Sequence, residues 1–191
     1  DRRVAQAASK SLRYVSQASS RLIAGNSPSL EKLEVILARH RLTEAALIFP
    51  TGYMANLGVL TALADKGTTI YSDELNHASI IDACRLSGAN VQVFRHNDVD
   101  HLENILRRTG RKIVITEGIF SMDGDAADLR SICYVAQKHN AITIVDDAHG
   151  DFIVGPSFSG MPANQGADVD IHVSSLSKGL GCFGGYVAAS N

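Results

Sequence analysis

The chain places one lysine, Lys178, at the start of a glycine-rich loop. An apolar run that ends in small hydroxyl residues precedes it, and four glycines fall among the seven residues 179–185. A lone amine among residues with almost no side chain can lie against a flat ligand, as a lysine that forms a Schiff base must. A flexible loop with a solvated lysine fits this segment equally well, so other parts of the chain have to decide.

A carboxylate and an imidazole follow another apolar run. Asp146 closes the run Ile-Thr-Ile-Val at 142–145, and His149 comes three residues later. A carboxylate at the end of a buried strand is costly without a cationic partner, and a protonated pyridine nitrogen is one such partner. The alternatives are a capping aspartate followed by a solvated histidine, or a metal site that combines Asp146, Asp147 and His149.

Three further segments could hold a flat, phosphorylated ligand. The ring of His77 can stack on a flat ring as aromatic side chains do, although this histidine could equally cap the helix that follows it. Gly52 and Tyr53 begin a helix after a strand, where backbone N–H groups bind phosphate; an ordinary capped helix is the alternative. Ser175 lies three residues before Lys178 and offers a hydroxyl contact to the same phosphate.

Short apolar runs alternate with helical patterns along the chain. Strands are expected at 46–49, 69–72, 91–94, 113–117, 142–146, 170–174 and 186–189, and helices at 30–40, 52–64, 78–86, 99–108 and 129–139. The alternation predicts an α/β fold whose mostly parallel, seven-stranded sheet is covered on both faces. Ligands of such sheets bind at the carboxyl ends of the strands, where the residues above, Glu117 and Ser121 all fall.

The composition narrows the classes of partner. The 191 residues suit one domain, and a formal net charge of −2 without a basic run indicates neither nucleic acid nor an anionic membrane. No apolar run approaches the roughly 18 residues of a membrane span. Three cysteines far apart in the sequence predict neither a disulfide framework nor a metal site, and they favour a cytoplasmic location.

Together, the strand-end residues describe a pyridoxal 5'-phosphate (PLP) site, and in this combination the chain resembles the α-oxoamine synthases. These belong to the fold-type-I PLP enzymes. The matching segments cover nearly the whole chain, at 51–56, 72–82, 96–98, 116–125, 145–150 and 175–179. The resemblance implies the three-layer large domain of a PLP-dependent transferase.

The resemblance also implies roles for individual residues. Lys178 is expected to carry the cofactor as an internal aldimine, and Asp146 to pair with the pyridine nitrogen. His149 is expected to contact the phenolic oxygen of the ring, and His77 to stack on the ring; these four are the expected catalytic residues. Ser121 is expected near the cofactor, the phosphate is expected among Gly52, Tyr53 and Ser175, and Glu117 and Arg21 are candidate substrate residues.

Members of the family condense an amino acid with an acyl-CoA or acyl-carrier thioester, usually with loss of carbon dioxide, and a homodimer is expected. Segments 96–98 and 148–150 look like the members that use L-alanine and a pimeloyl thioester in biotin synthesis. Segments 18–21 and 73–77 look more like the members that act on glycine, and members that act on serine remain open. A non-catalytic binding or dimerisation partner is a further alternative, which the presence of Lys178 disfavours.

The chain departs from the family pattern in several places. Residues 14–20 lack a glycine-rich run, Ser175 replaces a common threonine, and Asp151 adds a carboxylate that we expect beside the site. Family members are also much longer. Residues 1–191 are therefore expected to form an incomplete PLP-binding large domain, with the C-terminal small domain absent.

Overall fold

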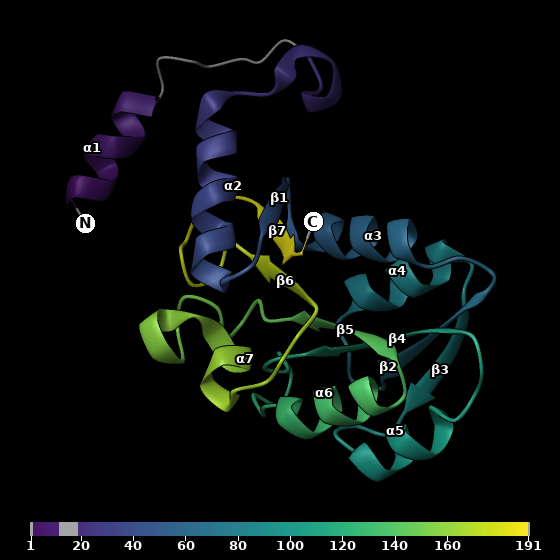
Figure 1. The fold of residues 1–191 in the computed structure, drawn as a ribbon. Coiled ribbons are helices and arrows are strands. Elements are labelled where there is room, and N and C mark those ends of the chain that lie inside the picture. Colours follow the sequence, from purple (N-terminus) through teal and green to yellow (C-terminus); the bar gives the residue numbers. More distant parts are fainter. Residues whose placement is uncertain (1, 12–18, 191) are drawn as a thin grey trace.

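The computed structural model describes residues 2–11 and 19–190, which form a three-layer α/β fold (Figure 1). The strands of the sheet are β1 (Ala45–Phe49), β2 (Thr68–Asp73), β3 (Asn90–Phe94), β4 (Arg111–Glu117), β5 (Ala141–Asp146), β6 (Ile171–Ser175) and β7 (Gly185–Ala189). The helices are α1 (Arg2–Ser11), α2 (Pro28–Arg41), α3 (Gly52–Leu63), α4 (Ala78–Ser87), α5 (Val99–Ile105), α6 (Leu129–Lys138) and α7 (Gly160–Gln165), with a π-helical turn η1 (Arg21–Gly25) and a 3-10 turn η2 (Pro156–Phe158).

The sheet has seven strands in the order β1-β7-β6-β5-β4-β2-β3. Strands β2 to β6 pair in parallel, and β7 runs antiparallel to both β6 and β1. The expected mostly parallel, seven-stranded sheet is therefore confirmed. The carboxyl ends of β2, β4, β5 and β6 meet at one edge of the sheet, where the candidate residues follow them.

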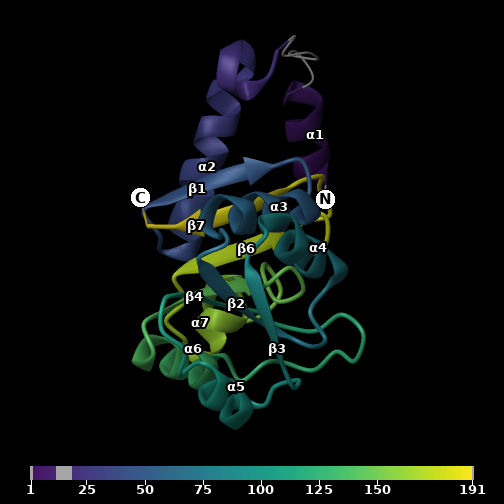
Figure 2. The same ribbon diagram turned by 90° about the vertical axis from the view of Figure 1, so that its right-hand side faces the viewer.

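Helices cover both faces of the sheet, as Figure 2 shows, with α3 and α4 on one face and α5, α6 and α7 on the other. A hydrophobic core lies on each face of the sheet. Successive side chains of β4 pack alternately into these two cores, because side chains alternate across a strand. Ile113 and Ile115 pack with α3 and α4, whereas Val114 between them packs with α6. This double burial explains why the strands read as continuous apolar runs.

The helix starts follow from local hydrogen bonds. Thr51 caps α3 by accepting from the Met54 amide (3.1 Å), and Ser27 caps α2 by accepting from the Leu30 amide (3.3 Å). These side chains satisfy amides that have no partner within the helix. The α5 helix ends at Ile105, short of the expected 108, because the chain turns through Gly110 (φ +106°) to begin β4.

The elements α1, η1, η2 and α7 were not predicted. η1, η2 and α7 are too short to show helical periodicity, which is the main sequence signal for a helix. The residues of α1 do have that periodicity, so this helix could have been predicted. In Figure 1 α1 lies apart from the sheet, and none of its residues is buried. None of the helices described by the structure has the length and apolar character that a membrane span needs.

Candidate active site

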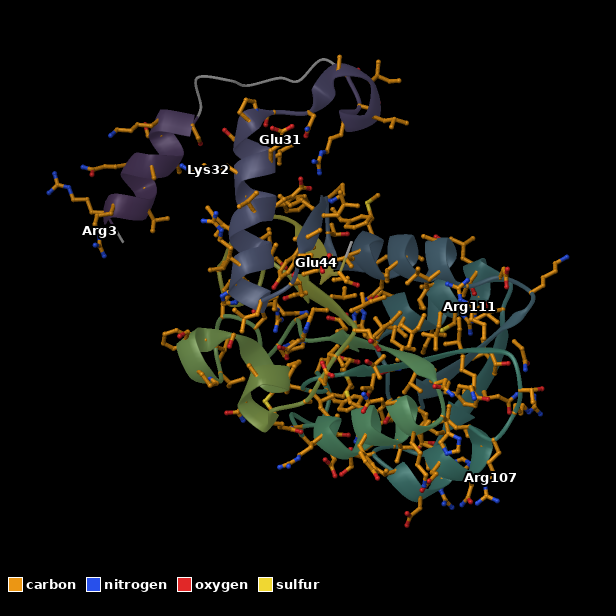
Figure 3. The ribbon with its side chains drawn as sticks, viewed as in Figure 1. Arg3, Glu31, Lys32, Glu44, Arg107 and Arg111 are labelled. Atoms are coloured by element: carbon orange, nitrogen blue, oxygen red, sulfur yellow. The ribbon has the colours of Figure 1, made fainter. Side chains whose placement is uncertain are left out.

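A cleft of about 180 Å³ opens at the carboxyl-end edge of the sheet, beside the start of α3. Arg111, labelled in Figure 3, begins β4 and marks the opposite edge of the sheet from Glu117, which ends that strand at the cleft. All of the expected site residues except Ser121 and Arg21 line the cleft. The lining residues are Thr51, Gly52, Tyr53, His77, Ser79, Glu117, Asp146, Ala148, His149, Ser175, Ser177 and Lys178.

Ser121 and Arg21 are not brought to this cleft. Ser121 is exposed in the turn that follows β4. Arg21 forms an ion pair with Glu34 (2.7 Å) and donates to the Ile48 carbonyl, which ties η1 to α2 and β1. In the stretch that departs from the family pattern, residues 12–18 lie outside the described part of the chain.

Asp146 is a buried carboxylate that has neutral hydrogen-bond donors around it. Its Oδ2 accepts from Asn56 Nδ2 at 2.7 Å, and its Oδ1 accepts from the Ala148 amide at 3.1 Å. Burial raises the pKa of Asp146, while the Asn56 hydrogen bond and the charge of Lys178 oppose that rise. No cationic side chain in the described residues forms an ion pair with Asp146. The carboxylate therefore fits a cationic group of a ligand.

Glu117 is a second buried carboxyl group at the same edge. Its Oε1 accepts from the backbone amide of His77 at 2.6 Å, which ties the end of β4 to the start of α4. Burial and the neighbouring Asp146 raise the pKa of Glu117 to about 7, and the charge of Lys178 opposes them. A carboxyl group with such a pKa can exchange a proton near neutral pH.

His77 both caps a helix and lines the cleft, so the two sequence interpretations do not compete. Its Nδ1 accepts from the Ser79 amide (3.2 Å) at the start of α4. The ring also lies edge-on to Tyr53, with ring centroids 6.5 Å apart. The Tyr53 hydroxyl in turn donates to Asp82 of α4. The Tyr53 ring is therefore fixed by α4 and lies against the His77 ring at the cleft.

The start of α3 forms an anion-binding end of the cleft. No described group accepts from the amides of Gly52 and Tyr53, and the hydroxyls of Ser175 and Ser177 lie 2.7 Å apart nearby. A Cβ on Gly52 would lie 3.2 Å from Cβ of Ser175, so glycine allows this close approach. Free amides at a helix start and adjacent hydroxyls are the donors that a phosphate needs.

Backbone hydrogen bonds close the loop that carries Lys178. The Gly181 amide donates to the Lys178 carbonyl (3.1 Å), and the Leu176 amide donates to the Gly184 carbonyl (2.9 Å). These bonds hold the turn after β6, and the exposed side chain of Lys178 lines the cleft. Burial and the charge of Lys178 lower the pKa of His149, and both side chains line the cleft.

Asp151 does not lie beside the site, so that expectation is wrong. Its carboxylate turns away to form ion pairs with Arg41 (3.2 Å) and His40 (3.0 Å). Asp147 also pairs with Arg41, at 3.2 Å. The buried guanidinium attracts both carboxylates because a charge is costly in the protein interior without a partner. Because Asp147 pairs with Arg41, it is not available as a ligand of the metal site that the sequence allowed. No metal-binding cluster occurs in residues 2–11 and 19–190.

Sequence reasoning missed Asn56, Ser79 and Ser177. Asn56 is buried on α3 and holds Asp146, and Ser79 is buried on α4 and contacts His77. The spacing of four residues from Gly52 to Asn56 puts both on one face of a helix and was the available signal. That spacing cannot reveal a contact with a strand about 90 residues further on.

A larger cavity, of about 540 Å³, lies elsewhere between α3 and β7. It is lined mainly by apolar side chains such as Phe49, Leu63 and Val187, and Asp170 is its one ionisable residue. It has no lysine, histidine or second carboxylate, so the smaller cleft, which has all three kinds of group, is the candidate active site.

The chain belongs to the aminotransferase class I and II family, whose model matches residues 1–191. Within that class it is similar to α-oxoamine synthases. It is 46% identical to 8-amino-7-oxononanoate synthase 2 of Bacillus subtilis over 195 residues, which span 100% of this chain and 50% of that protein. It is 47% identical to 8-amino-7-oxononanoate synthase of Marinobacter nauticus over 91% of this chain and 45% of that protein.

Solved structures agree with this assignment. Serine palmitoyltransferase from S. paucimobilis, with a bound PLP–myriocin aldimine, matches 100% of this chain and 50% of that one, with a TM-score of 0.96 and 36% identity. The 8-amino-7-oxononanoate synthase of Francisella tularensis matches 86% of this chain and 48% of that one, with a TM-score of 0.77 and 28% identity. The chain thus spans about half the length of the relatives it matches.

Proposed function

We propose that the cleft binds PLP through Lys178. The observation that carries this proposal is the meeting of three features at one strand-end edge. These are the amine of Lys178, the buried carboxylate of Asp146 with no cationic partner among the described residues, and the free amides at the start of α3. On this proposal residues 1–191 form a PLP-binding large domain.

Each residue has a defined task in the proposed site. Bound PLP supplies an electron sink for a carbanion at the α-carbon of an amino acid. Asp146 stabilises positive charge at the pyridine nitrogen, since burial strengthens that pairing. His149 contacts the phenolic oxygen, His77 covers one face of the ring, and the Gly52 and Tyr53 amides with Ser175 hold the phosphate. The amine of Lys178, once released, can carry a proton to or from the substrate.

We further propose acyl transfer from an acyl-CoA or acyl-carrier thioester to an amino acid, with decarboxylation, and in particular 8-amino-7-oxononanoate synthase activity in biotin synthesis. The curated relatives with this name, at 46% and 47% identity, support it. Glu117 is proposed to face the substrate. Arg21 and Ser121 lie outside the cleft, so a role for either requires a contact that the described chain does not make. A cytoplasmic homodimer is part of the same proposal.

Serine palmitoyltransferase activity is the second candidate, because the serine palmitoyltransferase structure matches the whole chain with a TM-score of 0.96. Glycine C-acetyltransferase activity and a non-catalytic partner role are the remaining alternatives. A panel of alanine, glycine and serine with short and long acyl-CoA thioesters separates the enzymatic candidates. Alanine with pimeloyl-CoA should give the fastest release of CoA. Preference for serine and palmitoyl-CoA would favour the second candidate instead.

Cofactor attachment can be tested before any substrate is known. After incubation with PLP and reduction with borohydride, the protein should gain one reduced cofactor, and peptide mass spectrometry should locate it on Lys178. The Lys178→Ala variant should gain none. Lys66→Ala, which changes an exposed lysine in the turn before β2, is the matched control and should label like the unchanged protein. Labelling that survives Lys178→Ala would rule out the proposed attachment.

A further inference from the structure

Asn56 connects two of the residues that line the cleft. One amide group, Asn56 Nδ2, donates to Asp146 Oδ2 at 2.7 Å and lies 2.9 Å from Ser79 Oγ. Both Asn56 and Ser79 are about 1% exposed. The opposite orientation of the Asn56 amide would put its carbonyl oxygen against the Asp146 carboxylate, which disfavours that orientation. Asp146 on β5 and Ser79 on α4 are therefore held by the same buried side chain.

Ser79 continues this connection to His77. The Ser79 backbone amide, which can only donate, lies 3.2 Å from His77 Nδ1. The Ser79 hydroxyl lies 2.8 Å from the same nitrogen, and its proton is free because Asn56 already donates to its oxygen. Two donors thus converge on His77 Nδ1, so this nitrogen carries the lone pair and Nε2 carries the proton.

We propose that Asn56 and Ser79 are positioning residues that fix the His77 ring as its Nε2–H tautomer and tie that ring to the carboxylate of Asp146. The ring then presents an N–H donor at Nε2, for which no described residue acts as an acceptor. The consequence for a bound PLP ring rests on the proposed function. Asn56 of α3 would then position His77, which faces the ring, together with Asp146, which pairs with the ring nitrogen.

The tautomer can be read directly from the protein without cofactor. Long-range ¹H–¹⁵N imidazole spectra in alkaline buffer, with His77→Gln to identify the signals, should show His77 with its proton on Nε2. Ser79→Ala and Asn56→Ala should move the Nδ1 signal toward that of a tautomer mixture, and Ser79→Thr, which keeps the hydroxyl, should restore it. Thr61→Ala in α3 and Ser87→Ala in α4 are matched controls, because their hydroxyls bond only to nearby backbone groups and not to the cleft.

Two results would overturn the inference: a proton on Nδ1 in the unchanged protein, or a His77 spectrum that Ser79→Ala leaves unaltered. A second measurement addresses the link to Asp146. PLP should bind Asn56→Ala at least about tenfold more weakly, since a hydrogen bond to a charged group is lost, and equal affinity would contradict the link. A protein that shows the Nε2–H tautomer but binds no PLP would contradict the proposed function and still support the assignment of the His77 ring.

Discussion

Glu117 and Asp146 are directly opposite each other at the last paired position of the parallel strands β4 and β5. Two buried carboxyl groups therefore meet at the cleft. Like charges this close resist simultaneous ionisation, and the pKa of Glu117 rises to about 7 as a result of burial and of Asp146. The pairing makes the protonation state of the empty cleft sensitive to pH near neutrality.

The first prediction concerns Glu117→Gln. The folded-state pKa of Glu117, about 7, lies above its ordinary value of 4.5, so the folded state binds the proton more tightly. Ionisation of this group then lowers stability as the pH rises from about 4.5 to 7. Glutamine keeps the oxygen that accepts from the His77 amide but cannot ionise. Urea unfolding should show the variant gaining roughly 2 kcal/mol on the unchanged protein between pH 5 and pH 8. A constant difference across that range would contradict the assignment.

The second prediction concerns His96, which bridges two loops at the same edge. Its Nδ1 lies 2.9 Å from Asp73 and its Nε2 lies 2.8 Å from Asp125. Burial alone would lower the pKa of His96, but the hydrogen bonds and charges of Asp73 and Asp125 raise it. The bridge should stabilise the fold fully below about pH 6.5 and less as the pH rises through the folded-state pKa.

The measurement is the unfolding free energy of His96→Gln at two pH values. The variant should lose about 1–3 kcal/mol at pH 5.5 and less at pH 9, because the stabilisation from the raised pKa of His96 is lost as the pH rises. The pH 9 comparison is the internal control for lost packing against Phe120, whose ring lies edge-on at 4.5 Å. An equal loss at both pH values would mean that packing, rather than the charged bridge, is responsible.

The third prediction concerns the buried guanidinium of Arg41. It pairs with Asp147 and Asp151, and it donates to the Tyr186 hydroxyl at 2.9 Å. Arg41→Ala leaves the buried carboxylate of Asp147 without a cation and Asp151 with His40 alone, and should cost about 3–5 kcal/mol of unfolding free energy. Arg39→Ala, an exposed change in the same helical turn, should stay within about 0.5 kcal/mol of the unchanged protein. Similar losses for the two variants would refute the importance of the buried pairs.

The fourth prediction concerns Gly185 at the start of β7. A Cβ at this position would approach the Gly52 amide more closely than van der Waals contact allows. Gly185→Ala should push the start of α3 away from the sheet, cost about 1–3 kcal/mol, and weaken PLP binding because the Gly52 amide moves. Gly67→Ala, in the exposed turn before β2, is the control. Unchanged affinity for PLP in Gly185→Ala would show that the phosphate binds elsewhere.

Much of the architecture could be predicted from the sequence, because strand periodicity and helix caps are local properties. Every strand of the sheet falls within two residues of its predicted ends, and α3 begins at the predicted Gly52. The rule that ligands bind at strand ends then located Lys178, Asp146 and Glu117 at one edge. The end of α5 and the six-residue helix α7 were harder to predict, since such short segments show little apolar periodicity.

The sequence by itself therefore determined which residues end each strand, and with them the candidate chemistry of Lys178 and Asp146. Only the tertiary structure decided how their neighbours are used. Asp151, adjacent in sequence to the site, turns toward Arg41, whereas Asn56, about 90 residues from Asp146, holds it directly. The reason is physical: a buried charge or amide takes the nearest partner in space. Distance along the chain does not specify that partner until the sheet and its helices have packed.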